Sequence, residues 1–244
     1  FTSSDPILNR LQELTRVSYL SNYVGIPTDC PHREKLGWTG DAMVAAETGL
    51  WDFRVAAGYR HFTRILADTQ RPSGQLPGIA PTSGWGYNWG SGPTFDSFLI
   101  QVPWYVWLYT GEDRPIRENY PEMKRYMEFC MGMADDHLLY FGLGDWSHHE
   151  PKRAAPVGIT ASGYYYINAI TMAKFADMLG YSEDQKDFLT LAENIRKSFR
   201  KTFYHGNGLY GNGEWTLLAC PVFQGLADPE EAEGAVQLLL QSVR

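Results

Sequence analysis

Residues 25–41 read GIPTDCPHREKLGWTGD and stand between two helical patterns. Proline fixes φ and pushes the residue before it towards an extended conformation, while glycine permits turns that a Cβ atom forbids. The composition therefore predicts a shaped loop in which three carboxylates, an arginine and a histidine lie close to Trp38. A simple connection between helices needs none of this chemistry, so the stretch indicates a functional site on a helical scaffold.

The bulk composition is that of a folded globular protein. The chain has 244 residues, 44% of them hydrophobic and 20% charged, which is enough for one large domain with a substantial core. Its net charge of −7 argues against nucleic acid, whose phosphates require a basic surface. No apolar run approaches the about 18 residues that cross a bilayer. We therefore expect neither nucleic acid nor a membrane as a partner.

Cysteine usage predicts no metal centre. The three cysteines are far apart and form no Cys-x-x-Cys, so neither a zinc site nor a disulfide framework is indicated. Cys30 and His32 supply only two neighbouring candidate ligands, which do not close a site. We expect no metal and no cofactor. The aromatic share is 14%, and tryptophan and tyrosine beside glycine and carboxylates in loops are typical of a carbohydrate-binding cleft.

Helical periodicity dominates the rest of the chain. Asp5 has the place of an N-cap before Pro6, and Gly180 that of a residue that ends a helix. Ser182 and Gln185 have the spacing of a capping box. Together with the apolar stripes, of which Ile7, Leu8, Leu11, Leu14 and Leu20 form the first, these signals predict about nine helices. Their expected ranges are 5–23, 42–51, 52–68, 96–109 with an interruption at Pro103, 121–135, 162–179, 182–203, 215–226 and 229–243.

Two long loops separate these helices. Residues 72–93 and 140–158 are rich in glycine and tryptophan, and loops of this length without structure of their own are usually functional. Runs with strand character occur only near residues 203–204 and 209–210, where they predict at most a small hairpin. Consecutive helical hairpins that stack in a ring gather their loops at one end. The predicted fold class is therefore all-α, an α/α toroid.

The segment from Asp29 to Asp41 resembles the signature of the α-L-rhamnosidases of glycoside hydrolase family 78. The pattern Asp-Cys-Pro-x-Arg-Glu-x-Leu-Gly-Trp-x-Gly-Asp runs through it unbroken. Weaker support comes from Thr94-Phe95-Asp96, from Val102-Pro103-Trp104 and from Tyr140-Phe141-Gly142-Leu143-Gly144-Asp145-Trp146. The family is built on a twelve-helix (α/α)6 barrel. The resemblance thus implies that residues 1–244 are a single catalytic-barrel fragment with about nine of the twelve helices.

The ends of the chain fit this expectation. The sequence opens at Phe1 rather than at methionine and stops at Arg244 on a helical pattern with no cap. We therefore expect a piece of a longer protein, with β-rich domains flanking the barrel in the parent.

The resemblance implies inverting hydrolysis of terminal α-L-rhamnosides, with Glu34 as the general acid. Glycoside hydrolysis needs one carboxyl group that protonates the leaving oxygen and a second that acts on the other face of the sugar. We expect Asp29 and Asp41 to favour the protonated form of Glu34 by like-charge repulsion. The alternative is a surface turn in which Glu34 pairs with Arg33 or Lys35.

The matched family positions also imply a set of substrate-binding residues. Carboxylates accept hydrogen bonds from sugar hydroxyls, a guanidinium donates in a fixed fork, and an indole face covers the methyl group of a 6-deoxy sugar. The expected residues are Asp29, Arg33, Trp38, Asp41, Asp96, Trp104 and Trp146. Structural alternatives are an Asp–Arg pair that braces the loop, an N-cap role for Asp96, and core packing for Trp104.

Three further features of the loops stay open between two roles. Trp85 and Trp89 fit a subsite for the leaving group or a lid. Asp145 fits a contact with sugar or a role in orienting Trp146. His148 and His149 fit solvated loop residues better than catalysts, and the sequence after Trp146 departs from the family's usual continuation, so the neighbouring subsite is not carried over from the family.

The general base is missing from this set. In the family it is a glutamate in the last third of the barrel, so we expect it beyond Arg244. Glu214 is the one other acid in an aromatic loop, but it matches no catalytic position of the family. We therefore expect the 244 residues alone to hydrolyse nothing at a useful rate. Competing hypotheses are another toroid enzyme, a lyase or a different glycosidase, and a relative that binds glycans without cleaving them.

Overall fold

The structure is a computed structural model that describes residues 1–82, 84, 86–146 and 154–242. Among these residues it contains eleven helices and one pair of two-residue strands, which confirms the expected helical class. The elements are α1 (Pro6–Ser21), β1 (Tyr23–Val24), β2 (Ile26–Pro27), α2 (Thr39–Val44), α3 (Ala46–Asp52), α4 (Ala56–Asp68), α5 (Pro93–Asp96), α6 (Phe98–Thr110), α7 (Arg114–Met133), α8 (Val157–Leu179), α9 (Ser182–Phe203), α10 (Trp215–Phe223) and α11 (Pro229–Ser242).

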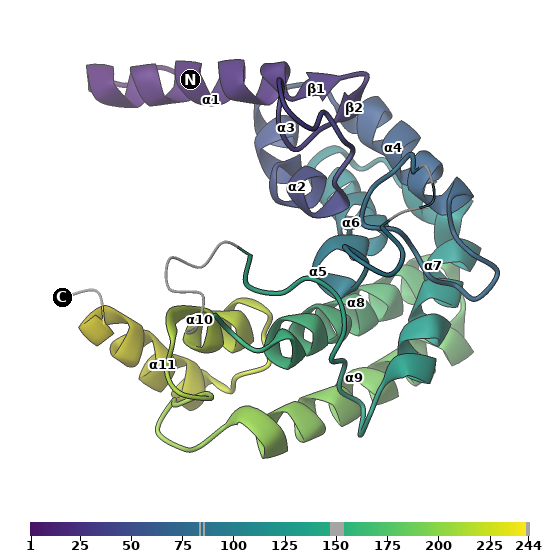
Figure 1. The fold of residues 1–244 in the computed structure, drawn as a ribbon, viewed down its shortest axis with the longest axis vertical. Coiled ribbons are helices and arrows are strands. Elements are labelled where there is room, and N and C mark those ends of the chain that lie inside the picture. The colour runs from purple at the N-terminus through teal and green to yellow at the C-terminus, as the bar shows by residue number, and fades with distance from the viewer. Residues whose placement is uncertain (83, 85, 147–153, 243–244) are drawn as a thin grey trace.

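The helices form an open arc with an inner and an outer row (Figure 1). The inner row consists of α2 with α3, α5 with α6, α8 and α10, and the outer row consists of α4, α7, α9 and α11. Sequence explains the division, because α6 and α8 carry apolar residues on all sides whereas α4, α7 and α9 are amphipathic. A helix without a polar face is stable only where neighbours cover it, which is the position of the inner row.

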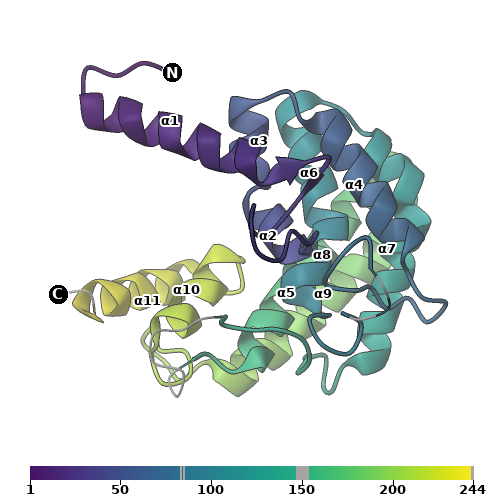
Figure 2. The same ribbon diagram turned by 45° about the horizontal axis from the view of Figure 1, so that its top comes forward.

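The described arc has α1 at one end and α10 with α11 at the other, and both termini lie on the same side (Figures 1 and 2). The apolar stripe of α1 does not pack on the described residues: Leu8, Leu11 and Leu14 are 46%, 53% and 47% exposed. At the opposite end Phe223 and Leu240 are 73% and 50% exposed. Apolar surface is thus left open at both ends of the arc.

The candidate site lies where the inner helices begin. Two of its cavities are lined by residues of α2, α5, α8 and α10, together with the loops that precede α2, α5 and α8. Each helix start carries unpaired backbone N–H groups and the positive end of the helix dipole. The arc therefore gathers positive partial charge around the carboxylates of residues 25–41.

Most helix ends agree with the sequence prediction. Asp5 caps α1 by accepting the Ile7 N–H at 2.8 Å, and α8 ends at Gly180, whose φ is +79°. The small hairpin expected near residues 203–210 is present as a single bridge between Tyr204 and Tyr210.

Other helix predictions were wrong in detail. Helix α6 runs through Pro103 without interruption, because burial of its surroundings outweighs the one missing backbone hydrogen bond. The capping box at Ser182 is absent, because Gln185 donates its backbone N–H to the Tyr181 carbonyl and the helix starts one residue earlier than a Ser182 cap requires. The single helix expected at 42–51 is broken at Ala45 into α2 and α3.

Candidate active site

The loop before α2 is closed by its own hydrogen bonds. Asp29 donates its backbone N–H to the Leu36 carbonyl at 3.1 Å, and the Leu36 N–H donates to Asp29 Oδ1 at 3.0 Å. Inside this closure the Glu34 N–H donates to Cys30 Sγ at 3.2 Å. Asp29 therefore braces the loop through its two hydrogen bonds with the backbone of Leu36. The Asp–Arg pair considered from sequence would have joined residues of this loop, and the described residues contain no such pair within the loop.

Glu34 is held by the tryptophan that follows it. Trp38 Nε1 donates to Glu34 Oε2 at 2.8 Å, although Glu34 as a residue is exposed. Glu34 does lie in an exposed turn, but within the described part of the chain no ion pair joins it to Arg33 or Lys35, and its carboxylate is bonded to Trp38 instead. An indole N–H can only donate, and the bond therefore fixes which carboxylate oxygen of Glu34 faces Trp38.

Trp38 is anchored from both sides. Its backbone pairs with Ile79 in a β-bridge, and its side chain is only 8% exposed. The Trp38 ring meets Phe95 with centroids 5.4 Å apart and Trp89 with centroids 5.6 Å apart, both edge to face. This geometry is the favoured arrangement for aromatic pairs. The Glu34 carboxylate is thus hydrogen-bonded to a buried ring that two other aromatic side chains contact.

A cavity of about 150 Å³ lies against these groups. The residues that line it are Asp29, Glu34, Trp38, Asp41, Trp89, Phe95, Leu143 and Trp146. The loop of Leu143 is joined to α5 by a hydrogen bond from the Thr94 hydroxyl to the Leu143 carbonyl. The structure therefore brings together five of the predicted site residues, Asp29, Glu34, Trp38, Asp41 and Trp146, and the whole lining comes from three separate segments of the chain.

Asp41 carries the clearest electrostatic signal of the site. Burial raises the pKa of Asp41, and the negative charges of Asp29 and Glu34 add to that increase, while a hydrogen bond to its own backbone opposes it. Asp41 lies in the first turn of α2, as predicted. Three carboxyl groups crowded into one polar and aromatic recess are suited to bind a neutral polyol rather than an anion.

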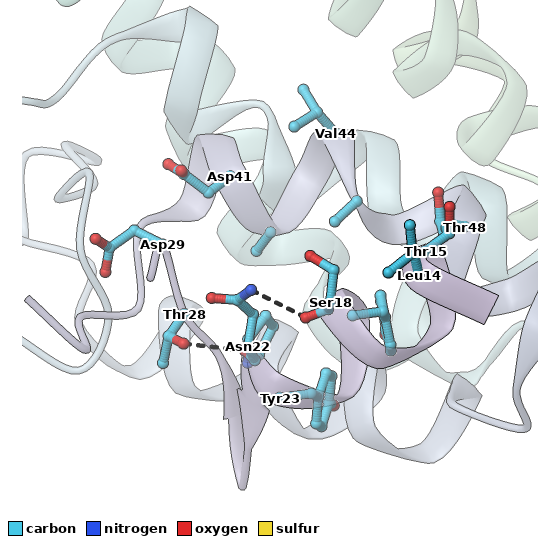
Figure 3. A pocket seen from close by; sticks show the side chains of 14 residues that line it. Leu14, Thr15, Ser18, Asn22, Tyr23, Thr28, Asp29, Asp41, Val44 and Thr48 are labelled. Carbon is cyan, nitrogen blue, oxygen red and sulfur yellow. Dashed lines mark hydrogen bonds between the residues drawn. The ribbon is translucent and has the colours of Figure 1, made fainter. Parts of the chain in front are cut away.

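Two larger cavities adjoin the first and share Asp41 with it. One, of about 470 Å³, continues past Trp146 to the residues of α8 and α10. The other, of about 500 Å³, lies between α1 and α2–α3. Figure 3 shows this cavity of about 500 Å³, with Asp29 and Asp41 at one edge and Ser18, Asn22 and Thr28 on its polar wall. Asp41 thus lines all three cavities.

Asp145 supports the loop that carries Trp146. Its Oδ2 accepts the Ala155 N–H and the Thr216 hydroxyl, each at 3.1 Å. These bonds connect the 140s loop to the approach of α8 and to α10. Of the two roles considered for Asp145, the bonds support positioning of Trp146, whose side chain is 66% exposed at the cavity rim.

Three predicted sugar-binding residues do not line the cavity. Asp96 is fully buried at the end of α5, where its Oδ2 accepts the Gly92 N–H at 2.7 Å and the Ser91 hydroxyl at 3.2 Å. It caps the start of the short helix α5, not the helix after it as the alternative supposed. Arg33 is exposed and is not part of the lining.

Trp104 lies in the packing between α6 and α8. Its ring stacks on Trp107 with centroids 4.9 Å apart and is covered by the Lys174 ammonium group at 4.4 Å. The surroundings of Trp104 are therefore those of a packing residue, which is the structural alternative considered from sequence.

The structure adds Phe95 and Leu143 to the predicted lining, and it also places Trp89 there, a residue for which a leaving-group subsite or a lid was considered from sequence. The sequence signal for each was proximity to a motif, since Phe95 and Leu143 belong to the two weaker motifs and Trp89 to the first long loop. Glu214 is at the N-cap of α10 and does not line this cavity. Trp85, His148 and His149 lie outside the described residues.

The described residues contain no group of three or more histidine, cysteine, aspartate or glutamate side chains arranged to hold a metal ion. No described helix has the length and apolar character needed to cross a membrane. All three cysteines are free thiols, and burial raises the pKa of Cys220 to about 12.

Comparison with known proteins supports what the geometry indicates. The family model for the bacterial α-L-rhamnosidase six-hairpin glycosidase domain matches residues 1–244. A protein of Formosa agariphila named α-L-rhamnosidase is 29% identical over 226 residues, which is 83% of this chain and 23% of that protein.

Solved structures give the same result. The α-L-rhamnosidase of Dictyoglumus thermophilum superposes with a TM-score of 0.89 at 29% identity, over 99% of this chain and 28% of its own. The Streptomyces avermitilis α-L-rhamnosidase complexed with L-rhamnose shares the fold, with a TM-score of 0.92 at 24% identity over 99% of this chain and 23% of its own. The chain spans about a quarter of the length of these relatives. The predicted all-α toroid of the (α/α)6 type is confirmed, and the chain belongs to the bacterial α-L-rhamnosidase six-hairpin glycosidase domain family.

Proposed function

We propose that the protein containing this chain hydrolyses terminal α-L-rhamnosides, with Glu34 as the general acid. The observation that carries the proposal is the Glu34–Trp38 hydrogen bond of 2.8 Å at a cavity whose other walls include Asp29 and Asp41. A carboxyl group fixed in this way presents one oxygen to a ligand, as an acid must when it protonates a glycosidic oxygen. Family membership and relatives named α-L-rhamnosidase support rhamnose as the sugar.

The reaction follows from these groups. Water adds to the anomeric carbon as the bond from that carbon to the glycosidic oxygen breaks. The proton of Glu34 goes to the departing oxygen, and the proton of the attacking water goes to a general base on the opposite face. Asp29 and Asp41 accept hydrogen bonds from sugar hydroxyls, and the faces of Trp38 and Trp146 cover the apolar side of the ring.

The general base belongs, in this proposal, to a part of the protein outside residues 1–244. The carboxyl groups of the described cavity are Asp29, Glu34 and Asp41, all on the same loop or its adjoining helix. The chain covers 23% of the Formosa agariphila relative, and apolar surface is open at both ends of the described arc. We therefore propose that residues 1–244 are one fragment of a twelve-helix barrel that further helices complete, with β-rich domains beside it.

Hydrolysis of p-nitrophenyl α-L-rhamnoside by the full-length protein tests the function. We expect release of p-nitrophenol, and proton NMR of the first sugar formed should show the β anomer, which the expected inversion requires. Residues 1–244 alone should release no p-nitrophenol, because the base is absent. A full-length protein that binds rhamnose without turnover would support the glycan-binding alternative, and an unsaturated product would support a lyase.

A further inference from the structure

Helix α5 connects two of the segments that line the small cavity. The Phe95 ring meets the Trp38 ring, with centroids 5.4 Å apart. The neighbouring Thr94 donates its hydroxyl proton to the Leu143 carbonyl, and Leu143 lines the same cavity. Two adjacent residues of one short helix thus contact the loop before α2 and the loop that leads to Trp146.

The backbones of α5 and of the second loop touch beside this hydrogen bond. A Cβ atom on Gly92 would lie 2.6 Å from the Gly142 Cα atom, and one on Gly142 would lie 2.5 Å from the Ser91 carbonyl oxygen. Both glycines have a positive φ, +123° and +98°. Because glycine alone allows so close an approach at such a φ, the crossing of Gly92 and Gly142 brings the Leu143 carbonyl within reach of Thr94.

The α5 side of this crossing is fixed to buried structure. Asp96 is fully buried, and its Oδ2 accepts the Gly92 N–H at 2.7 Å. In return the Gly92 carbonyl accepts the Asp96 N–H at 2.9 Å and the Phe95 N–H at 3.0 Å. The start of α5 is therefore held by both backbone and side chain, and it provides a fixed point for the loop that crosses it.

The loop of residues 140–146 is anchored at two positions before Trp146. The carboxylate of Asp145 joins it to the segment before α8 and to α10, and Thr94 joins it to α5 through Leu143. Thr94 also lines the recess of about 470 Å³. A hydroxyl has a single proton, however, and Thr94 donates that proton to the loop, so it is not available to a sugar.

We infer that Thr94 is a positioning residue for the sugar, and that its hydroxyl holds Leu143 and Trp146 where they line the cavity. The inference rests on the proposed function, which assigns the apolar side of the sugar to Trp146. Neither Leu143 nor Trp146 exchanges a proton in that reaction. Loss of the hydrogen bond should therefore weaken the ground state and the transition state equally, which raises KM and leaves kcat unchanged.

The test compares Thr94→Val, which removes the hydroxyl from a side chain of similar shape, with Thr94→Ser, which keeps it. In the full-length protein, Thr94→Val should raise the Kd for L-rhamnose by calorimetry and the KM for p-nitrophenyl α-L-rhamnoside about 3–10-fold, with kcat within about twofold. Thr94→Ser should stay within about twofold of wild type in all three constants. If Thr94→Val does not fold, Thr94→Ala removes the same hydroxyl and takes its place.

A double-mutant cycle shows whether the effect passes through Trp146. In a Trp146→Ala background, Thr94→Val should change Kd and KM by no more than about a further twofold. Thr190→Val is the matched control, because the Thr190 hydroxyl donates to the Lys186 carbonyl at 2.8 Å on the exposed surface of α9. Its replacement should change neither constant by more than about twofold.

The outcomes separate this inference from the function on which it rests. A wild-type protein that neither binds L-rhamnose nor releases p-nitrophenol rejects both. A wild-type protein that binds without turnover rejects the hydrolase, and the Kd comparison still decides the role of Thr94.

Three results reject the positioning role while the rhamnosidase function stands. The first is unchanged Kd and KM in Thr94→Val, with or without a loss in kcat. The second is an equal loss in Thr94→Ser, which keeps the hydroxyl. The third is the full loss on adding Thr94→Val to Trp146→Ala.

Discussion

Asp96 is a buried carboxyl group whose two oxygens have different surroundings. Oδ2 accepts hydrogen bonds from Gly92 and Ser91, whereas Oδ1 has no well-formed hydrogen bond, and the Tyr126 hydroxyl is a further polar group that interacts with the carboxyl. Burial raises the pKa of Asp96 well above its ordinary value of 3.8, against the opposing effects of Gly92, Ser91 and Tyr126. The folded protein therefore binds this proton more tightly than the unfolded chain does.

Replacement of Asp96 by asparagine should stabilise the protein at neutral and higher pH. Because the folded-state pKa is raised, the wild-type free energy of unfolding falls as pH rises from about 4 through that pKa. The amide keeps an oxygen for Gly92 and Ser91 and places an uncharged NH₂ group where Oδ1 lies, next to the Tyr126 hydroxyl, which can accept from it. We expect Asp96→Asn to gain about 1–3 kcal/mol at pH 8 and less at pH 4.5, measured by urea unfolding.

Asp68→Asn is the control for that comparison. Asp68 is an exposed partner of Arg64 at 2.6 Å, so its replacement should change the unfolding free energy by less than about 0.5 kcal/mol. An Asp96→Asn protein that is less stable than wild type at pH 8 would show that Asp96 is held as a carboxylate.

At the scale of residues, the sequence predicts correctly which side chains lie together when all of them belong to one local motif. Asp29, Glu34 and Trp38 come together because one loop of ten residues closes on itself through Asp29 and Leu36. Asp96 differs, since nothing in its immediate sequence tells whether a carboxylate faces a cavity or the core. That outcome depends on the packing of Tyr126, thirty positions further along the chain.

At the scale of elements, the loop before α2 is locked to a second loop. The Ala80 N–H donates to the Gly37 carbonyl at 2.9 Å, and the Thr39 N–H donates to the Gly78 carbonyl at 2.9 Å. A Cβ atom on Gly37 would lie 2.0 Å from the Ala80 carbonyl oxygen, which is backbone and cannot rotate away. The position of Trp38 thus depends on a glycine beside it.

Gly37→Ala should separate the two loops. We expect a loss of about 2–4 kcal/mol in the free energy of unfolding, because overpacking against backbone forces both segments to move. Gly132→Ala is the control: Gly132 is in α7, and an added Cβ meets nothing within 4 Å. That change should be neutral or gain up to about 1 kcal/mol through helix propensity. Equal stability of the two variants in urea unfolding would contradict the close contact at Ala80.

Element positions were predictable from periodicity, but several boundaries were not. The apolar pattern predicted a helix around Pro103 and an interruption at the proline itself. Burial on all sides of α6 kept that helix continuous, and burial is a property of the neighbours rather than of the segment. The break at Ala45 that divides α2 from α3 has no proline or glycine to announce it.

At the scale of the whole molecule, the described arc has α1 at one end and α10 with α11 at the other (Figure 2). Apolar side chains of these helices are exposed. Sequence predicted the apolar stripe of α1, but no periodicity within one helix tells which partner covers it. The proposal that further helices complete the ring assigns that partner to a part of the protein outside residues 1–244.

Leu11→Glu tests this assignment. In residues 1–244 the side chain is 53% exposed, so the change should alter the free energy of unfolding by less than about 0.5 kcal/mol. In the full-length protein a glutamate at a covered position should cost about 2–4 kcal/mol. Leu189→Glu, on the outer helix α9 at 48% exposure, should be tolerated in both proteins. Equal tolerance of the two variants in the full-length protein would rule out a partner on α1.

The central claim is that Glu34 supplies the proton for the departing oxygen. Glu34→Gln in the full-length protein tests it most directly, assayed with a rhamnosyl disaccharide and with α-L-rhamnosyl fluoride. Fluoride departs without a proton, so its kcat/KM should stay within about tenfold of wild type, while that for the disaccharide should fall by about 10²–10⁴-fold. Equal losses on the two substrates, or unchanged turnover of the disaccharide, would contradict the claim.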